Sequence, residues 1–192
     1  MAGSDMTKQE ARETAKKAYG LWKAASPSGP FDASETIWER VEGAQAFRKA
    51  GTVLLYMSIE GEVMTRDFIS KWSGTKRIAL PLVKGRDLVL KEYSHDRLKE
   101  GYRGIIEPSD NAPDIPLEEI DLAIVPGTAF AIYDSKVLRL GRGGGFYDRL
   151  LSRAKCPTIG VCYSCRLLKD LPTDPLDVVL DDLVTEKNYT VK

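Results

Sequence analysis

The spacing of apolar residues predicts helices over the first quarter of the chain. Each helix is opened by a capping box, in which a short polar side chain and an acidic one bond the free backbone amides of a helix start. The helices are predicted over residues 8–25, opened by Thr7 and Glu10, and over residues 32–51, opened by Asp32 and Glu35. Between them, the prolines and glycine of residues 26–30 interrupt the helical pattern.

Beyond residue 51, short β-branched and apolar runs alternate with helical stretches. Strands are predicted over residues 52–57, 77–83, 87–93, 121–125, 158–163 and 178–184, and helices over residues 65–72 and 146–154. This order is typical of an α/β protein, so we expect a three-layer sandwich with a largely parallel sheet covered by helices. The proline-rich residues 108–116 are expected to form a loop, and one function open to this loop is to close over a site as a lid.

The length and composition are those of one ordinary globular domain. The chain has 192 residues, 43% of them hydrophobic, and no repeat or linker, so we expect a single domain over residues 6–192. Residues 1–5 precede a second methionine and resemble an expression remnant. Lys plus Arg equals Asp plus Glu at 28 each, which disfavours nucleic acid as a partner. Short apolar runs, no signal-like start and three cysteines favour a cytoplasmic protein without membrane contact, and we expect a monomer.

Candidate chemistry is concentrated in residues 139–149, which read RLGRGGGFYDR. Four glycines within five residues leave backbone amides bare for an anion, and the following helix turns its positive end toward them. Arg139, Arg142 and Arg149 add guanidinium donors that suit phosphate. Asp148 is placed to hold a magnesium ion that bridges such phosphates. The segment therefore predicts a phosphate-binding loop.

Two common nucleotide motifs are excluded at this loop. After Gly141 and Gly143, the position that needs the third glycine of a dinucleotide fingerprint holds Phe146. No Gly-Lys-Ser/Thr occurs in the chain, so the loop is not a Walker A motif either.

Several segments together resemble the 5-formyltetrahydrofolate cyclo-ligases, also called methenyltetrahydrofolate synthetases. They are residues 139–149 preceded by 125–130, residues 58–65, 104–108, 171–177 and 181–186, and the basic pair Lys8 and Arg12. The resemblance implies a reaction in which ATP phosphorylates the formyl oxygen on N5 of the folate. N10 then attacks the activated carbon and releases phosphate, which leaves 5,10-methenyltetrahydrofolate.

The resemblance also implies roles for particular residues. Arg142 and Tyr147 would be catalytic, and Asp148 and Asp177 would hold Mg²⁺. ATP would be bound by Lys8, Arg12, Arg139, Leu140, Gly141, Arg142, Gly143, Gly144, Gly145, Phe146 and Tyr147. The folate would be bound by Met57, Glu62, Arg142, Gly143, Gly144, Gly145 and Phe146. A carboxylate at Glu62 suits the paired donors of a pterin, whereas Met57 alone would be read as core.

Three residues depart from the family pattern. Gly144 stands where some members carry lysine, Phe146 replaces the first of a usual Tyr-Tyr pair, and Arg166 stands where we expect glutamine. These departures keep two rival functions open. One is a nucleotide- or folate-binding protein without turnover, and the other is an enzyme of similar architecture that acts on a sugar phosphate.

The cysteines allow a third alternative, a redox or zinc site. Cys162 and Cys165 form a C-x-x-C, which with Cys156 and the lone His95 could supply four ligands. Irregular spacing and a position at a strand end disfavour it.

Overall fold

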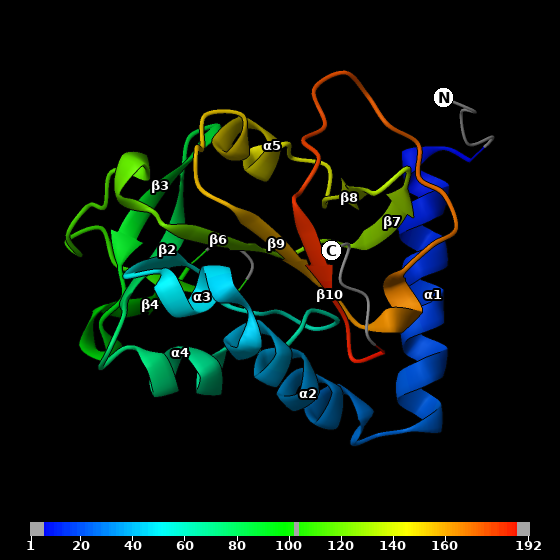
Figure 1. Ribbon diagram of the computed structural model, residues 1–192, viewed down its shortest axis with the longest axis horizontal. Helices are drawn as coiled ribbons and strands as arrows, with labels where there is room; N and C mark the ends of the chain where they lie inside the picture. Colours follow the sequence, from blue (N-terminus) through cyan, green and yellow to red (C-terminus); the bar gives the residue numbers. More distant parts are fainter. Residues whose placement is uncertain (1–5, 102–103, 188–192) are drawn as a thin grey trace.

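A six-stranded sheet runs through the centre of the molecule, in the order β10-β9-β6-β1-β2-β3 (Figure 1). The computed structural model describes residues 6–101 and 104–187. Neighbouring strands of this sheet are parallel except β2 and β3, which pair antiparallel. The elements are α1 (Lys8–Ala25), α2 (Gly29–Gly43), α3 (Gln45–Lys49), β1 (Thr52–Leu54), α4 (Arg66–Trp72), β2 (Arg77–Lys84), β3 (Asp87–Glu92), η1 (His95–Arg97), β4 (Leu98–Glu100), β5 (Ile106–Pro108), η3 (Leu117–Glu119), β6 (Leu122–Val125), β7 (Ala129–Tyr133), β8 (Lys136–Leu140), α5 (Phe146–Leu151), β9 (Thr158–Val161), η4 (Ser164–Arg166) and β10 (Asp182–Val184).

Apolar side chains cover both faces of the sheet because successive strand residues point to opposite sides. Val53 joins a cluster formed with α2, α3 and α4, whereas Leu54 joins a cluster formed with α5 and the β7–β8 hairpin. Figure 1 shows α2 and α4 below the sheet and α5 above it. The predicted three-layer α/β sandwich is confirmed, with the difference that a β-hairpin covers much of the second face.

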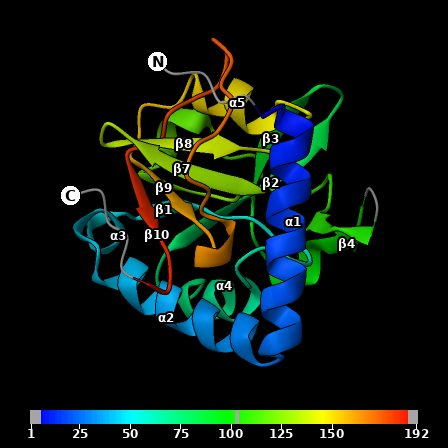
Figure 2. The ribbon, with the colours of Figure 1, turned by 90° about the vertical axis from the view of Figure 1, so that its right-hand side faces the viewer.

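Helix α1 runs the height of the face shown in Figure 2, from the level of α5 to that of α2. Ala11 and Ala15 pack against Ala129 and Ala131 of β7, while Tyr19 reaches the cluster around α2. Small alanine side chains let the helix approach the hairpin closely, and this brings the amino-terminal half of α1 to the glycine loop. No helix within residues 6–101 and 104–187 is long and apolar enough to cross a membrane.

The first predicted helix is confirmed, and the second needs correction. Thr7 and Glu10 make both bonds of the capping box, and α1 ends at Ala25 as predicted. Helix α2 begins at Gly29 rather than Asp32, so Asp32 lies in its first turn and the predicted second capping box is wrong. Proline is compatible with a first helical turn because its missing N–H has no partner there. The helix also stops at Gly43, because the extended backbone of Ala44 (ψ 136°) separates it from α3.

Two strand pairs were not predicted. Strands β7 and β8 form an antiparallel hairpin whose turn residues, Asp134 and Ser135, have φ of 47° and 58°. Strands β4 and β5 form a second short pair. Four further predicted elements are shorter in the structure by two residues or more: the first strand ends at Leu54, the helix after the glycine loop at Leu151 and the strand from Thr158 at Val161, and the last strand occupies only 182–184.

The proline-rich residues 108–116 are tied to β3. The ammonium group of Lys91 donates hydrogen bonds of 2.9 Å to the carbonyls of Asp110 and Ala112 and pairs with Asp114 at 2.9 Å. Ile115 is buried and its amide bonds the carbonyl of Leu90. The segment is a loop as predicted, and these bonds favour a fixed loop over a lid.

Candidate functional site

A cavity of about 790 Å³ opens where the chain leaves β1 and β6. From β1 the sheet continues to β2 and β3 on one side, and from β6 it continues to β9 and β10 on the other. Such a switch point creates a crevice at the carboxyl ends of parallel strands, where α/β proteins bind ligands. Tyr56 and Met57 line the cavity just after β1, and Pro126 and Gly127 line it just after β6.

The cavity is lined by every residue predicted for ATP, folate or metal. These are Lys8, Arg12, Met57, Glu62, Arg139, Leu140, Gly141, Arg142, Gly143, Gly144, Gly145, Phe146, Tyr147, Asp148 and Asp177. They come from α1, the turn after β1, the end of β8, the glycine loop, α5 and the segment before β10. The structure thus brings together residues up to 169 positions apart.

The glycine loop connects β8 to α5 in a backbone shape that side chains disfavour. Gly143 and Gly145 have φ of 103° and 64°, in the left-handed region. At Gly144 a Cβ atom would lie 2.7 Å from the ring of Phe146, so a lysine there would require this ring to move. Helix α5 has only six residues. Its dipole is therefore small, and bare loop amides and arginines supply most of the attraction for an anion.

Arg139 and Asp148 form a buried ion pair at the base of the loop. Nη2 of Arg139 lies 2.8 Å from Oδ1 of Asp148, and the two side chains are 3% and 18% exposed. The guanidinium also lies over the ring of Tyr147, 5.6 Å from its centroid. Its Nε has no hydrogen-bond partner among the described residues. A buried donor without a partner is costly, so this nitrogen is available to a ligand oxygen.

Helix α1 contributes two cations to the same end of the cavity. Nζ of Lys8 lies 2.6 Å from Asp177 and 2.7 Å from Asp174, and Arg12 donates from Nε to the carbonyl of Gly141 at 2.9 Å. Burial alone would lower the pKa of Lys8, but its bonds to the two carboxylates raise the pKa above the ordinary value. Lys8 is therefore charged at neutral pH. This end of the cavity has the groups needed for a polyanion.

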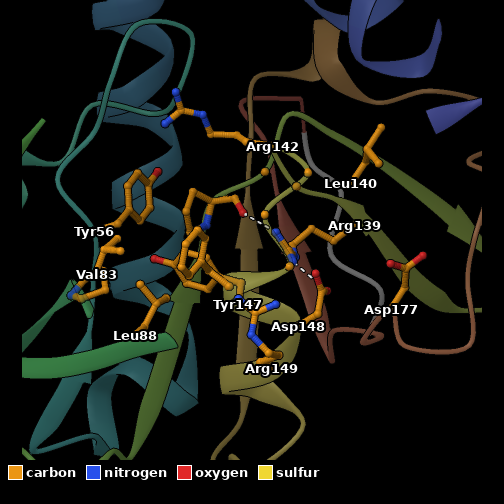
Figure 3. A pocket seen from close by; sticks show the side chains of 18 of the residues that line it. Tyr56, Val83, Leu88, Arg139, Leu140, Arg142, Tyr147, Asp148, Arg149 and Asp177 are labelled. Atoms are coloured by element: carbon orange, nitrogen blue, oxygen red, sulfur yellow. Dashed lines mark hydrogen bonds and ion pairs between the residues drawn. The ribbon is translucent and has the colours of Figure 1, made fainter. Parts of the chain in front are cut away.

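The opposite end is largely apolar and is lined by Tyr56, Val83, Leu88 and Tyr147 (Figure 3). The hydroxyl of Tyr147 is buried and has no hydrogen-bond partner within the described part of the chain. Burial raises the pKa of Tyr147 far above its ordinary value, so the phenol stays protonated. This end can hold a flat ring system and offer it one hydroxyl.

Glu62 is a carboxylate at the edge of the apolar end. Its Oε2 accepts a hydrogen bond from the amide of Ile59 at 3.1 Å. Burial raises the pKa of Glu62, against smaller opposing effects of this bond and of the charges of Arg142 and Arg166. A half-buried carboxylate that lacks a direct ion pair in the described chain can bond paired N–H donors of a ligand.

The two predicted metal ligands each hold a cation in the structure, Asp148 with Arg139 and Asp177 with Lys8. Figure 3 shows Asp148 and Asp177 on the same side of the cavity, away from Tyr56. No group of three or more potential protein ligands occurs in the described residues. Two carboxylates nevertheless fit Mg²⁺, which commonly takes one or two carboxylates together with substrate phosphates and water. A phosphate that engages both cations would free both carboxylates for the ion.

The cysteines do not assemble into a site in the described structure. Cys162 is buried in the cluster around α5, whereas Cys165 packs against the cluster around α2. Cys156, Cys162 and Cys165 are free thiols, and His95 is exposed in η1. These positions disfavour the redox and zinc alternatives.

Sequence reasoning missed two acidic residues of the cavity, Asp174 and Glu107, and most of the apolar wall. Asp174 bonds Lys8 together with Asp177, and its place beside a predicted metal ligand was a usable signal. Tyr56, Val83 and Leu88 lie in or beside predicted strands, so their pattern did not separate wall from core.

Fold and site together define an α/β protein in which a glycine- and arginine-rich loop adjoins a pocket that is apolar at its other end. The sequence profile of the 5-formyltetrahydrofolate cyclo-ligase family matches residues 5–186. The chain belongs to this family, and the resemblance and the enzyme class inferred from its motifs are confirmed.

Curated relatives and solved structures agree. The chain is 36% identical to the 5-formyltetrahydrofolate cyclo-ligase of Haemophilus influenzae, over 71% of this chain and 76% of the relative. It is 34% identical to that of Escherichia coli K12, over 71% of this chain and 78% of the relative. The solved 5,10-methenyltetrahydrofolate synthetase of Aquifex aeolicus is 34% identical, with a TM-score of 0.81 over 96% of this chain and 92% of that one.

Proposed function

We propose that this chain converts 5-formyltetrahydrofolate to 5,10-methenyltetrahydrofolate at the expense of ATP, with Mg²⁺. The observation that carries the proposal is the cavity itself. Its cationic end adjoins an apolar end that has a half-buried carboxyl group and a hydroxyl without a hydrogen-bond partner among the described residues, within about 790 Å³. Pockets of this size bury most of a drug-sized ligand. The difference between the two ends supports a triphosphate at the cationic end and a pterin at the apolar end.

Each end has a separate task. Lys8, Arg12, Arg139 and the glycine amides would bind the phosphates of ATP, and Arg142 would stabilise the charge that moves in phosphoryl transfer. Glu62 would accept the pterin N–H donors, with Met57 against the ring. Tyr147 of α5 would contact the folate. It would stack on the ring or donate its unpaired hydroxyl to the formyl group.

The chemistry needs positioning rather than a protein nucleophile. The formyl oxygen attacks the γ-phosphorus, and ADP leaves. N10 then adds to the formyl carbon, the C–O bond breaks with release of inorganic phosphate, and the N10 proton passes to solvent. A formamide oxygen leaves poorly, and phosphorylation corrects this. Holding the two reactants in place supplies much of the rate enhancement of such reactions.

The proposed metal ligands are Asp148 and Asp177. Mg²⁺ would neutralise phosphate charge beside the loop. On ligand binding, Arg139 would exchange Asp148, and Lys8 would exchange Asp177, for phosphate oxygens. This exchange keeps each buried charge paired in both states.

The test is the near-ultraviolet absorbance of the methenyl product, followed with 5-formyltetrahydrofolate, ATP and Mg²⁺. We expect a band that requires all three, and none when a non-hydrolysable ATP analogue replaces ATP. Arg142→Gln should lower turnover by 100-fold or more, on the order expected for loss of a transition-state donor. The matched control is Arg153→Gln, an exposed arginine outside the cavity, which should keep normal turnover.

Two other outcomes would contradict the proposal. ATP binding without product would favour the binding-protein alternative, and product formed without ATP would exclude the phosphorylation mechanism. A monomeric state and a cytoplasmic location stay predictions. Size-exclusion chromatography with light scattering checks the first, and cell fractionation checks the second.

A further inference from the structure

A second cavity, of about 270 Å³, lies beside the proposed active site. Five residues line both cavities and form the boundary between them: Arg12, Ile59, Glu62, Gly127 and Arg142. The second cavity is otherwise lined by residues without a role in the proposed reaction, among them Lys16 of α1 and Arg166 of η4.

Arg166 forms the buried part of this side cavity. It is 6% exposed, donates from Nη1 to the carbonyl of Thr128 at 2.9 Å, and lies over the ring of Tyr19 at 4.9 Å. Its Nε has no hydrogen-bond partner, and its guanidinium has no ion pair with a carboxylate, within residues 6–101 and 104–187. Buried guanidinium groups are normally paired, since an unpaired charge loses the solvation of water. Arg166 therefore has no directly bonded anion in that part of the chain, although Glu60 and Glu62 are near enough to interact with its charge.

The backbone opposite Arg166 is shaped to accommodate it. Gly61 has φ of 85°, and a Cβ atom there would lie 2.1 Å from Nη2 of Arg166. Any other residue would push the guanidinium out of its position. The arginine is thus held by a bare turn, an aromatic ring and a carbonyl, and none of these supplies a negative charge.

The exposed wall of the cavity is also cationic. Arg12 and Lys16 lie one turn apart on the same face of α1. Two carboxylates, Glu60 and Glu62, line the cavity too. Glu60 is already engaged by Lys23 at 2.7 Å and by the hydroxyl of Tyr19. The charge left for a ligand is positive.

We propose that this side cavity is an oxyanion subsite, in which the guanidinium of Arg166 and the ammonium of Lys16 bind a phosphate or carboxylate group. Both groups match the fork of guanidinium donors. The cavity is too small for a second nucleotide but large enough for such a group with water. Two sources are available: the phosphate released in the reaction, and a glutamyl carboxylate of the folate. The choice of source rests on the proposed function, whereas the site itself does not.

The first experiment needs no turnover. The protein is saturated with Mg²⁺ and a non-hydrolysable ATP analogue, which occupies the glycine loop, and inorganic phosphate is titrated at constant ionic strength. The Nε–H signal of Arg166 in a ¹H–¹⁵N NMR spectrum, assigned by its loss in Arg166→Gln, should shift and saturate. Calorimetry should show phosphate binding weakened about 10-fold or more in Arg166→Gln, the effect expected for one charge-assisted hydrogen bond.

Lys16 provides a test that is independent of folding, because its side chain is exposed. Lys16→Gln should weaken phosphate binding several-fold. Lys17→Gln removes the same charge from the adjacent exposed position, lines neither cavity, and should leave binding unchanged. Phosphate binding of equal strength in wild type and Arg166→Gln, or an Arg166 signal that does not respond, would overturn the proposal.

Steady-state kinetics then distinguish the two sources. If the subsite takes the glutamyl carboxylate, phosphate competes with the folate, and Arg166→Gln raises KM for the folate. If it takes released phosphate, phosphate inhibits without competing with the folate, and Arg166→Gln relieves the inhibition at unchanged KM. If the protein shows no turnover, only this kinetic comparison is lost, because the phosphate titration does not require turnover.

Discussion

The ion pair between Arg139 and Asp148 predicts that Asp148→Asn destabilises the fold as well as any metal site. The two side chains are 3% and 18% exposed and meet at 2.8 Å. Removal of one partner of a buried pair costs about 3–5 kcal/mol, because the other charge stays buried. Asparagine keeps an oxygen that can accept the hydrogen bond, so we expect the lower end, about 3 kcal/mol. For a chain of 150–250 residues each kcal/mol moves Tm by roughly 2–4 °C, which gives a fall of about 6–12 °C.

The matched control is Asp87→Asn. Asp87 pairs with Arg149 at 3.2 Å, but the two side chains are 60% and 39% exposed. Exposed pairs contribute about 0–1 kcal/mol, so Tm should fall by less than about 4 °C. Urea denaturation followed by circular dichroism measures both free energies of unfolding. A double variant, Arg139→Gln with Asp148→Asn, should recover part of the loss because no unpaired charge remains.

Equal stability of Asp148→Asn and Asp87→Asn would refute this reasoning. Activity of Asp148→Asn must therefore be measured well below its own Tm. Otherwise, unfolding would be mistaken for loss of the metal ligand.

Three further measurements test the site and the chain around it. Burial raises the pKa of Glu62, so its carboxylate becomes protonated, as pH falls, at a higher pH than an ordinary glutamate does. KM for the folate should rise in that pH range, and Glu62→Gln should remove this pH dependence. Gly61→Ala places a Cβ at a residue with left-handed φ, 2.1 Å from a guanidinium nitrogen, so it should lower the free energy of unfolding in urea by about 2 kcal/mol or more. Gly20→Ala in α1, where the new Cβ has no atom within 4 Å, should raise it by about 0.5–1 kcal/mol. Burial raises the pKa of Cys162, and it raises the pKa of Cys165 to about 11. Ellman's reagent at pH 8 should therefore modify both thiols slowly in the native protein and quickly in guanidinium. Fast labelling of these two thiols in the native protein would contradict their packing.

Sequence pattern was sufficient for the strands that are buried on both faces. Residues 122–125 are a continuous apolar run, residues 158–161 contain the β-branched Thr158, Ile159 and Val161, and both segments are fully buried strands of the parallel sheet. The β7–β8 hairpin was missed because its turn is Asp134-Ser135, in the left-handed conformation, instead of a glycine-containing pair. Both turn residues are exposed, whereas the strand residues Phe130 and Val137 pack into the core, so the hairpin is held by its strands more than by its turn.

The capping-box error has a similar cause. The residue types of Asp32 and Glu35 fit a box, yet Pro30 starts the helix earlier and Asp32 instead accepts a bond from the hydroxyl of Ser28. At the site, charged residues and glycines were predictable because their chemistry is unusual for a turn. Tyr56 and Val83 were not, because wall and core use the same apolar residues.

The charges of the cavity explain why a site built for a polyanion and a metal can fold without either. Lys8 and Arg139 lie where phosphates are proposed, and Asp177 and Asp148 lie where Mg²⁺ is proposed. Without ligands, Lys8 is paired with Asp177 and Arg139 with Asp148, so neither of these two cations is left without a counter-charge. The side cavity differs, since the guanidinium of Arg166 forms no direct ion pair with a carboxylate in the described chain, and its Nε has no hydrogen-bond partner there. We therefore propose different ligands for the two cavities: the first would exchange its internal pairs for a metal–phosphate complex, whereas the second would accept an anion alone.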